Sequence, residues 1–161
     1  MLSDQEQIIN CLKQLHMPTI RYSFEEIADQ ARAESWSHEQ YLLQLLNLEC
    51  ETRWQNRISR NLRASKLPPS KTFENFDKKR LPAKVANHLN VLINGSFLNQ
   101  SENILAFGNP GSGKTHLLCA IGHELIEKGK QVLFISCSHL VQDLLIAKKE
   151  LELPKKLNKL S

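Results

Sequence analysis

The stretch GNPGSGKT at residues 108–115 has the residue types and the spacing of a phosphate-binding loop. It matches G-x-x-x-x-G-K-[ST] in full, and its glycines allow the positive φ angles that turn successive backbone N–H groups toward one anion. Lys114 would bring a positive charge to the β- and γ-phosphates, and the Thr115 hydroxyl would bind Mg²⁺. The pattern therefore predicts a site for ATP and Mg²⁺. Its expected members are Gly108, Asn109, Pro110, Gly111, Ser112, Gly113, Lys114, Thr115 and His116.

The segments around this loop have the hydrophobic patterns that such a loop requires. Residues 103–107 are a short apolar run that predicts a buried strand, and residues 131–135 predict a second one. Apolar residues recur at helical spacing after the loop, so we expect a helix whose N-terminal end faces the anion. A strand, a loop and a helix in this order are the context that makes the motif specific.

Three side chains on the helix after the loop could also be metal ligands. His116, Cys119 and His123 are spaced i, i+3 and i+7 and so share one face. We expect no zinc site, because such sites normally use four ligands, and we expect the helix to pack on the sheet through this face. The chain has four cysteines and no C-x-x-C pair, which favours reduced thiols that serve as small buried side chains.

The first third of the chain predicts a small bundle of helices. Ser3 is placed to cap the first helix, which Pro18 would end. Ser23 and Glu26 have the S-x-x-E spacing of a capping box and predict the start of a second, short helix. A third and longer helix would run from a cap at Ser37 to about residue 64.

Basic charge is concentrated in the second half of this third helix and in the segment after it. The net charge is −5 over residues 1–50, +6 over residues 51–80 and +3 over residues 81–161. Helical spacing aligns four arginines along this stretch, which predicts a face that can contact the phosphates of a polyanion. The alternative is a solvated face, or one paired with acidic residues of the first fifty. The arginines are Arg53, Arg57, Arg60 and Arg63.

These patterns divide the chain into three parts. We expect a helical domain over residues 1–66, a proline-containing linker over 67–82, and a nucleotide-binding core over 83–161. The predicted fold class is α/β, a P-loop NTPase with an incomplete parallel sheet, preceded by a small all-α domain. Neither a signal peptide nor a membrane-spanning run is evident, so we expect a cytoplasmic protein.

The arginine-bearing helix leads into the segment KTFENFD at residues 71–77, and this combination is more particular than the loop. From about Gln40 to the end, the chain resembles the IstB family of transposition helper ATPases, which are related to DnaC-type helicase loaders. The resemblance implies an AAA+ core that self-associates on double-stranded DNA in an ATP-dependent manner and works with a transposase. It implies as well that the arginine-bearing helix and the linker help to bind the DNA. It also implies that Phe73 and Phe76 lie near the adenine.

The chain departs from that family in its length. Members continue into a strand that ends in an acidic pair for the metal, then a sensor residue and an arginine finger, and these 161 residues contain none of them. Asp143, the acid after the second predicted strand, falls inside a predicted helix. The family's strand order, 5-1-4-3-2, would also keep residues 103–107 and 131–135 apart. We therefore expect a shortened protein, a remnant or frameshifted product of a mobile element, that binds ATP without efficient hydrolysis.

Three other functions remain open at this point. A DnaC-like loader of a replicative helicase would have the same chemistry and a different partner. A non-catalytic DNA-binding or interfering protein would act through the helical region and its arginine-bearing face. A small P-loop kinase is the weakest alternative, since neither an acceptor site nor a lid is recognisable in the sequence.

Overall fold

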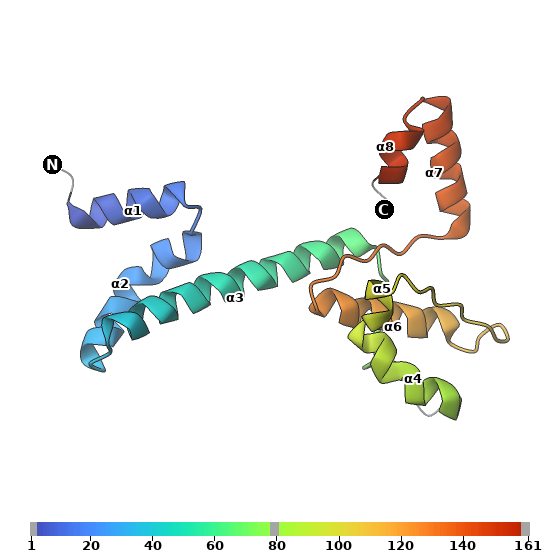
Figure 1. Ribbon diagram of the computed structural model, residues 1–161, viewed down its shortest axis with the longest axis horizontal. Coiled ribbons are helices and arrows are strands. Elements are labelled where there is room, and N and C mark those ends of the chain that lie inside the picture. Colours follow the sequence, from blue (N-terminus) through green and yellow to red (C-terminus); the bar gives the residue numbers. More distant parts are fainter. Residues whose placement is uncertain (1–2, 78–80, 159–161) are drawn as a thin grey trace. The chain divides into compact units, whose positions relative to one another are not determined.

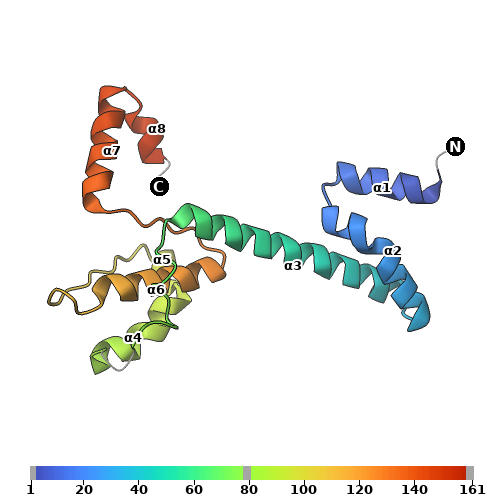
Figure 2. The same cartoon turned by 180° about the vertical axis from the view of Figure 1, so that it is seen from behind.

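The computed structural model describes residues 3–77 and 81–158, and these form two compact units that divide between Ser59 and Arg60. The division falls inside the longest helix, which is drawn in teal and green (Figure 1, Figure 2). The last part of that helix therefore belongs with the C-terminal unit. The predicted boundary lay a few residues further on, at the end of the same helix.

The N-terminal unit consists of helices, as the sequence predicts. Helix α1 spans Asp4–Gln14, α2 spans Pro18–Ala33, and α3 spans His38–Ser65 and continues past the division. An apolar cluster is formed by α2 and α3, with the half-buried Leu12 of α1 packed against it. Its buried members are Ile20, Ile27 and Leu45.

Two of the predicted helix caps are confirmed. The Ser3 hydroxyl accepts a hydrogen bond from the Glu6 N–H at 3.2 Å, and the Glu6 carboxylate accepts one from the Ser3 N–H at 2.8 Å. Ser37 and Gln40 make the same reciprocal pair at the start of α3. Both pairs satisfy backbone donors that the first turn of a helix leaves without partners.

The predicted capping box at Ser23 is wrong. Helix α2 begins five residues earlier, at Pro18, and the Ser23 hydroxyl donates to the carbonyl oxygen of Thr19 inside the helix. Proline suits the first helical position because its φ is fixed near the helical value and it has no N–H to satisfy. Pro18 therefore begins the second helix as well as following the first.

The C-terminal unit contains the predicted helix that ends at Asn94-Gly95 and the helix after the loop. Its apolar cluster joins α4 to α6 through Leu89, Ile121 and Leu125. Gly95 ends α4 with a φ of 72°, in the left-handed region that glycine adopts readily. The helices of this unit are α4 (Ala83–Asn94), α5 (Ser96–Asn99), α6 (Lys114–Glu127), α7 (Cys137–Lys149) and α8 (Leu153–Asn158).

The predicted sheet is not confirmed. Neither residues 103–107 nor residues 131–135 form a strand, and no strand occurs in the part of the chain that the structure describes. The second segment is bonded to the end of α3, because the Phe134 N–H donates to the Ser65 carbonyl oxygen at 2.7 Å. The first segment is largely exposed: Phe107 keeps 87% of its surface accessible. Extended chain becomes a strand only when a neighbouring strand satisfies its backbone groups.

All four cysteines are free, but only Cys119 is buried, so the prediction of buried side chains is wrong for Cys11, Cys50 and Cys137. Burial raises the pKa of the Cys119 thiol. Among the described helices, none has the length and apolar character needed to cross a membrane.

Candidate functional site

The predicted phosphate loop has the backbone geometry that its glycines allow. Gly111 and Gly113 lie in the left-handed region, with φ angles of 78° and 87°, and Gly108 has a φ of 154°. Gly113 is the N-cap of α6. The loop is closed by a turn in which the Ser112 N–H donates to the Asn109 carbonyl oxygen at 3.2 Å.

Lys114 lies over this loop. Its ammonium group donates to the carbonyl oxygens of Gly108, at 2.9 Å, and Asn109, at 2.8 Å. These acceptors are neutral, and no carboxylate pairs with Lys114 among the residues that the structure describes. The positive charge of Lys114 is therefore oriented by the loop but not neutralised.

The N-terminal end of α6 differs from those of the helices that carry caps. Ser136 caps α7 with its side chain, and the Glu49 carboxylate accepts from the first N–H groups of α2. Gly113 has no side chain, and α6 has no side-chain cap. Because the first N–H groups of a helix lack partners within it and carry a partial positive charge, this end of α6 is suited to an anion.

Thr115 and His116 complete the predicted loop, and they differ in their surroundings. Thr115 is exposed in the first turn of α6, where its hydroxyl is a hard oxygen ligand of the kind that Mg²⁺ prefers. The His116 ring is half-buried, and its Nε2 donates to the Thr72 carbonyl oxygen at 3.0 Å. His123 makes a similar bond to the Pro68 carbonyl oxygen at 3.1 Å. The shared face of α6 therefore packs on residues 68–76 rather than on a sheet.

An apolar cavity adjoins the loop, with a volume of about 620 Å³. Helix α4, the segment before the loop and α6 contribute to its wall, and Gly113 and Lys114 are among the residues that line it. Its volume falls in the range of small-molecule sites. Phe76, expected near a nucleotide base, also lines this cavity, together with Leu81, Pro82, Val85 and Leu92.

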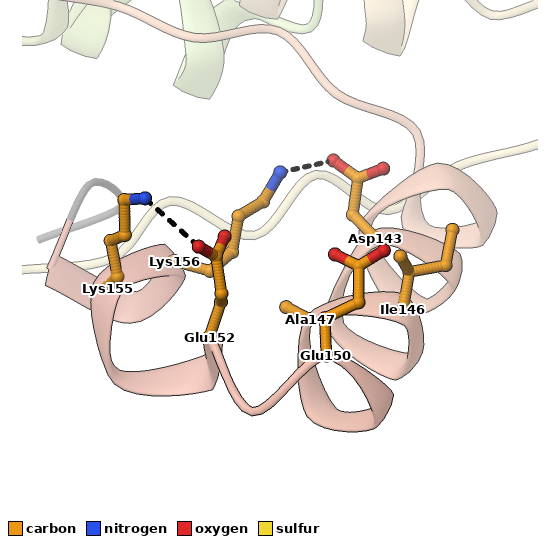
Figure 3. Close-up of a pocket in the computed structure, with 7 residues that line it drawn as sticks. All are labelled: Asp143, Ile146, Ala147, Glu150, Glu152, Lys155 and Lys156. Carbon is orange, nitrogen blue, oxygen red and sulfur yellow. Dashed lines mark hydrogen bonds and ion pairs between the residues drawn. The ribbon is translucent and has the colours of Figure 1, made fainter.

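Asp143 lies inside a helix, as predicted, and has a partner of its own. It is part of α7, and its carboxylate accepts from the Lys156 ammonium of α8 at 2.7 Å (Figure 3). This hydrogen bond and the charge of Lys156 hold the pKa of the Asp143 carboxyl below its ordinary value. The contact closes the α7–α8 hairpin beside a hollow lined by both helices (Figure 3).

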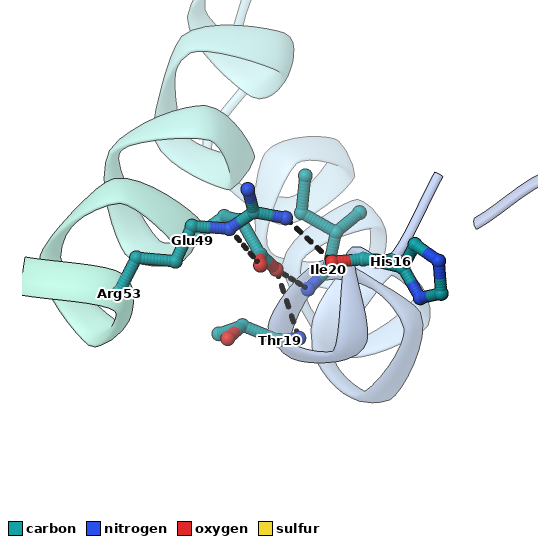
Figure 4. Close-up of polar contacts among 5 residues, drawn as sticks. All are labelled: His16, Thr19, Ile20, Glu49 and Arg53. Carbon is teal, nitrogen blue, oxygen red and sulfur yellow. Dashed lines mark hydrogen bonds and ion pairs between the residues drawn. The ribbon is translucent and has the colours of Figure 1, made fainter. Parts of the chain in front are cut away.

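Arg53, one of the arginines expected to contact DNA, is used inside the N-terminal unit. Its Nε donates to the Glu49 carboxylate at 2.8 Å, and its Nη2 donates to the His16 carbonyl oxygen (Figure 4). The same carboxylate accepts from the N–H groups of Thr19, at 2.9 Å, and Ile20, at 3.1 Å. For Arg53 the structure therefore favours the alternative of pairing with an acidic residue of the first fifty.

The other three arginines have exposed side chains. The Arg57 guanidinium carbon lies 5.7 Å from the centre of the Trp54 ring, a cation–π contact. The side chains of Arg60 and Arg63 make no hydrogen bond or ion pair within the described parts of the chain. These two remain available for an external anion, and their contact with DNA stays a prediction.

Sequence reasoning missed Glu49, Trp54 and the contacts of residues 68–76. Glu49 is 3% exposed and lies four residues after the buried Leu45. An acidic residue on the apolar face of α3 was therefore the signal in the sequence that could have indicated a buried, paired carboxylate. Trp54 stands three residues before Arg57, a spacing that brings two side chains together on a helix. No local pattern could have predicted that the carbonyl groups of Pro68 and Thr72 bind histidines of α6.

A glycine-rich loop that holds a lysine over the uncapped end of a helix defines a phosphate-loop nucleotide-binding protein. Residues 10–161 match the family described as IstB-like ATP binding protein. The chain belongs to this family, as its resemblance in sequence predicts.

Curated relatives support the same assignment, and their names describe ATP-binding proteins of insertion sequences. A relative from Sinorhizobium fredii is 38% identical over 98% of this chain and 53% of its own length. The ATP-binding protein of IS5376 from Geobacillus stearothermophilus is 35% identical over 95% of this chain and 61% of its own length. The ATP-binding protein of IS21 from Pseudomonas aeruginosa is 33% identical over 93% of this chain and 57% of its own length. The chain thus spans between about half and three fifths of the length of these relatives.

Proposed function

We propose that this chain binds ATP together with Mg²⁺ at residues 108–116 and serves as an ATP-binding helper in DNA transposition. The observation that carries the proposal is the uncapped N-terminal end of α6, with the charge of Lys114 held beside it. Calorimetric titration with Mg·ATP is the test. One saturable site supports the proposal, and absence of binding overturns it.

The remaining parts of the nucleotide also have candidate positions. Thr115 would hold the Mg²⁺, which would link the phosphates to the protein, while Lys114 and the N–H groups of the loop would bind the phosphates themselves. The apolar cavity beside Phe76 would take the base. An AAA+ fold, with residues 103–107 as the strand that enters the loop, belongs to the same proposal.

The rate of ATP hydrolysis is the subject of a separate proposal. We expect a polypeptide of these 161 residues to bind Mg·ATP without efficient hydrolysis, because hydrolysis needs a second acidic group for the metal and a residue that positions water. Asp143, the acid that follows the loop helix in the sequence, is paired with Lys156. Phosphate release is expected to stay at the level of the Lys114→Ala variant. A Lys114-dependent turnover would contradict this expectation.

Contact with double-stranded DNA is proposed for the exposed arginines of α3. Exchanging both Arg60 and Arg63 for alanine should weaken binding similarly for all sequences, and should reduce the slope of log K against log salt by about two. The reason is that each phosphate contact releases counterions, so each lost contact removes part of the salt dependence. Fluorescence anisotropy of a labelled duplex at several salt concentrations measures both quantities.

A double variant with the same change of charge is the control for this experiment. Lys148 and Lys149 are exposed at the end of α7, and alanine at both positions also removes two positive charges. This control should leave the salt slope unchanged. If both double variants reduce the slope equally, the effect is one of net charge, and the arginines form only a solvated face.

A transposase is the proposed protein partner, by analogy with the insertion-sequence relatives, and self-association on DNA is part of the same proposal. A DnaC-like role with a replicative helicase is the alternative, and co-purification with each candidate partner distinguishes the two. A cytoplasmic location likewise stays a prediction.

A further inference from the structure

A strap, which we define as residues 67–76, lies along one face of α6. Two histidines of the helix hold it: His116 Nε2 donates to the Thr72 carbonyl oxygen at 3.0 Å, and His123 Nε2 donates to the Pro68 carbonyl oxygen at 3.1 Å. A carbonyl oxygen can only accept, so the proton lies on Nε2 in both rings. Leu67 packs so closely on Gly122 that a Cβ there would be 3.2 Å from the leucine side chain.

The far end of the strap reaches the phosphate loop. Phe76 lies against Gly113, where an added Cβ would be 3.4 Å from the phenylalanine ring. The Phe76 ring also contacts the His116 ring edge to face, with 5.1 Å between their centres. His116 thus makes both a hydrogen bond and a ring contact with the strap, one residue after the predicted Mg²⁺ ligand Thr115.

We propose that His116 is a positioning residue for the phosphate loop. Its bond to Thr72 fixes the strap, the strap holds the Phe76 ring against Gly113, and this contact keeps the first turn of α6 in the geometry that receives phosphates. The proposal rests on the proposed binding of ATP. A loop that is ordered before its ligand arrives loses less entropy on binding, so release of the strap lowers nucleotide affinity. The imidazole that the alanine variant removes is bonded to Thr72, while the backbone N–H of residue 116 is kept.

The two histidines provide a matched pair of variants. His116→Ala should weaken Mg·ATP binding about 5-fold, the effect of losing one hydrogen bond of average net strength. His123→Ala removes a bond of the same kind from the same strap two turns further along α6, and it should leave the affinity unchanged. His116→Gln should restore binding, because the glutamine amide can place a donor close to the position of Nε2. Calorimetric titration measures all three.

Hydrogen exchange on the nucleotide-free protein separates this inference from the proposed function. The Leu117 amide, which donates to the Gly113 carbonyl oxygen at 2.8 Å and closes the first turn of α6, should exchange faster in His116→Ala than in the unaltered protein or in His123→Ala. If the unaltered protein fails to bind Mg·ATP, the proposed function is wrong, while the exchange rates still decide the role of His116. Equal exchange in the two alanine variants, or an equal loss of affinity in both, would overturn the positioning role.

Discussion

Replacing Lys114 with alanine is expected to weaken Mg·ATP binding about 100-fold, equivalent to about 3 kcal/mol, the upper range for a hydrogen bond to a charged group. The ammonium group is already oriented over the loop by the carbonyl oxygens of Gly108 and Asn109, so the phosphates meet a charge that needs little ordering. Calorimetric titration gives the affinities. The thermal shift with nucleotide is an independent readout, since a ligand at 100 times its Kd stabilises the folded state by about 2.7 kcal/mol.

Two further variants serve as controls for Lys114→Ala. Lys148→Ala removes an exposed lysine of α7 and should bind Mg·ATP like the unaltered protein. Lys114→Arg keeps the charge but changes the shape of the donor group, so it should bind with intermediate affinity. If Lys114→Ala retains full affinity, the nucleotide is bound elsewhere, and the loop is a glycine-rich turn without this function.

The features that sequence predicted well are those fixed by nearby residues. The caps at Ser3 and Ser37 each depend on a partner three residues along the chain, and the end of α4 depends on Gly95 alone. The loop and the start of α6 are likewise contained within residues 108–116. Such interactions can be predicted from the local sequence because the groups that make them are only a few residues apart.

Features that depend on distant partners could not be predicted in this way. The cap of α2 comes from Glu49, about thirty residues away, so Pro18 could begin a helix where the S-x-x-E pattern at Ser23 indicated a later start. The strap is fixed by histidines more than forty residues further along the chain. Residues 103–107 have the composition of a strand, but a strand also needs a neighbour that no local pattern specifies.

Replacing Glu49 with alanine should lower the free energy of unfolding of the N-terminal unit by about 3 kcal/mol, because the variant loses both the cap of α2 and a charge-assisted hydrogen bond. The change would leave the N–H groups of Thr19 and Ile20 without their acceptor, and Arg53 without its carboxylate. For a unit of this size the melting temperature should fall by more than about 10 °C.

The two tryptophans allow this unit to be observed by itself. Trp36 packs against the N-terminal core and Trp54 is exposed, so Trp54→Phe leaves Trp36 as the single reporter of unfolding. In that background Glu51→Ala, which removes an exposed acid from the same helix, should change little. Arg53→Ala should cost only about 1 kcal/mol, because its side chain is 54% exposed and the carboxylate still caps α2. Equal effects of all three variants would contradict the central role of Glu49.

Acid should reveal the same interaction without any mutation. Burial alone would raise the pKa of Glu49, but the hydrogen bonds from Arg53, Ile20 and Thr19, with the charge of Arg53, outweigh it and hold the pKa below its ordinary value of 4.5. The carboxylate therefore contributes its full stabilisation above pH 4.5 and loses it as the pH falls through the lowered pKa. Glu49→Gln removes the titratable group and resembles the protonated carboxyl, so the stability of the unaltered protein should fall toward that of this variant in the acid range. If the difference in free energy of unfolding between the unaltered protein and Glu49→Gln stays constant between pH 7 and pH 3, then shape and packing, not charge, make Glu49 important.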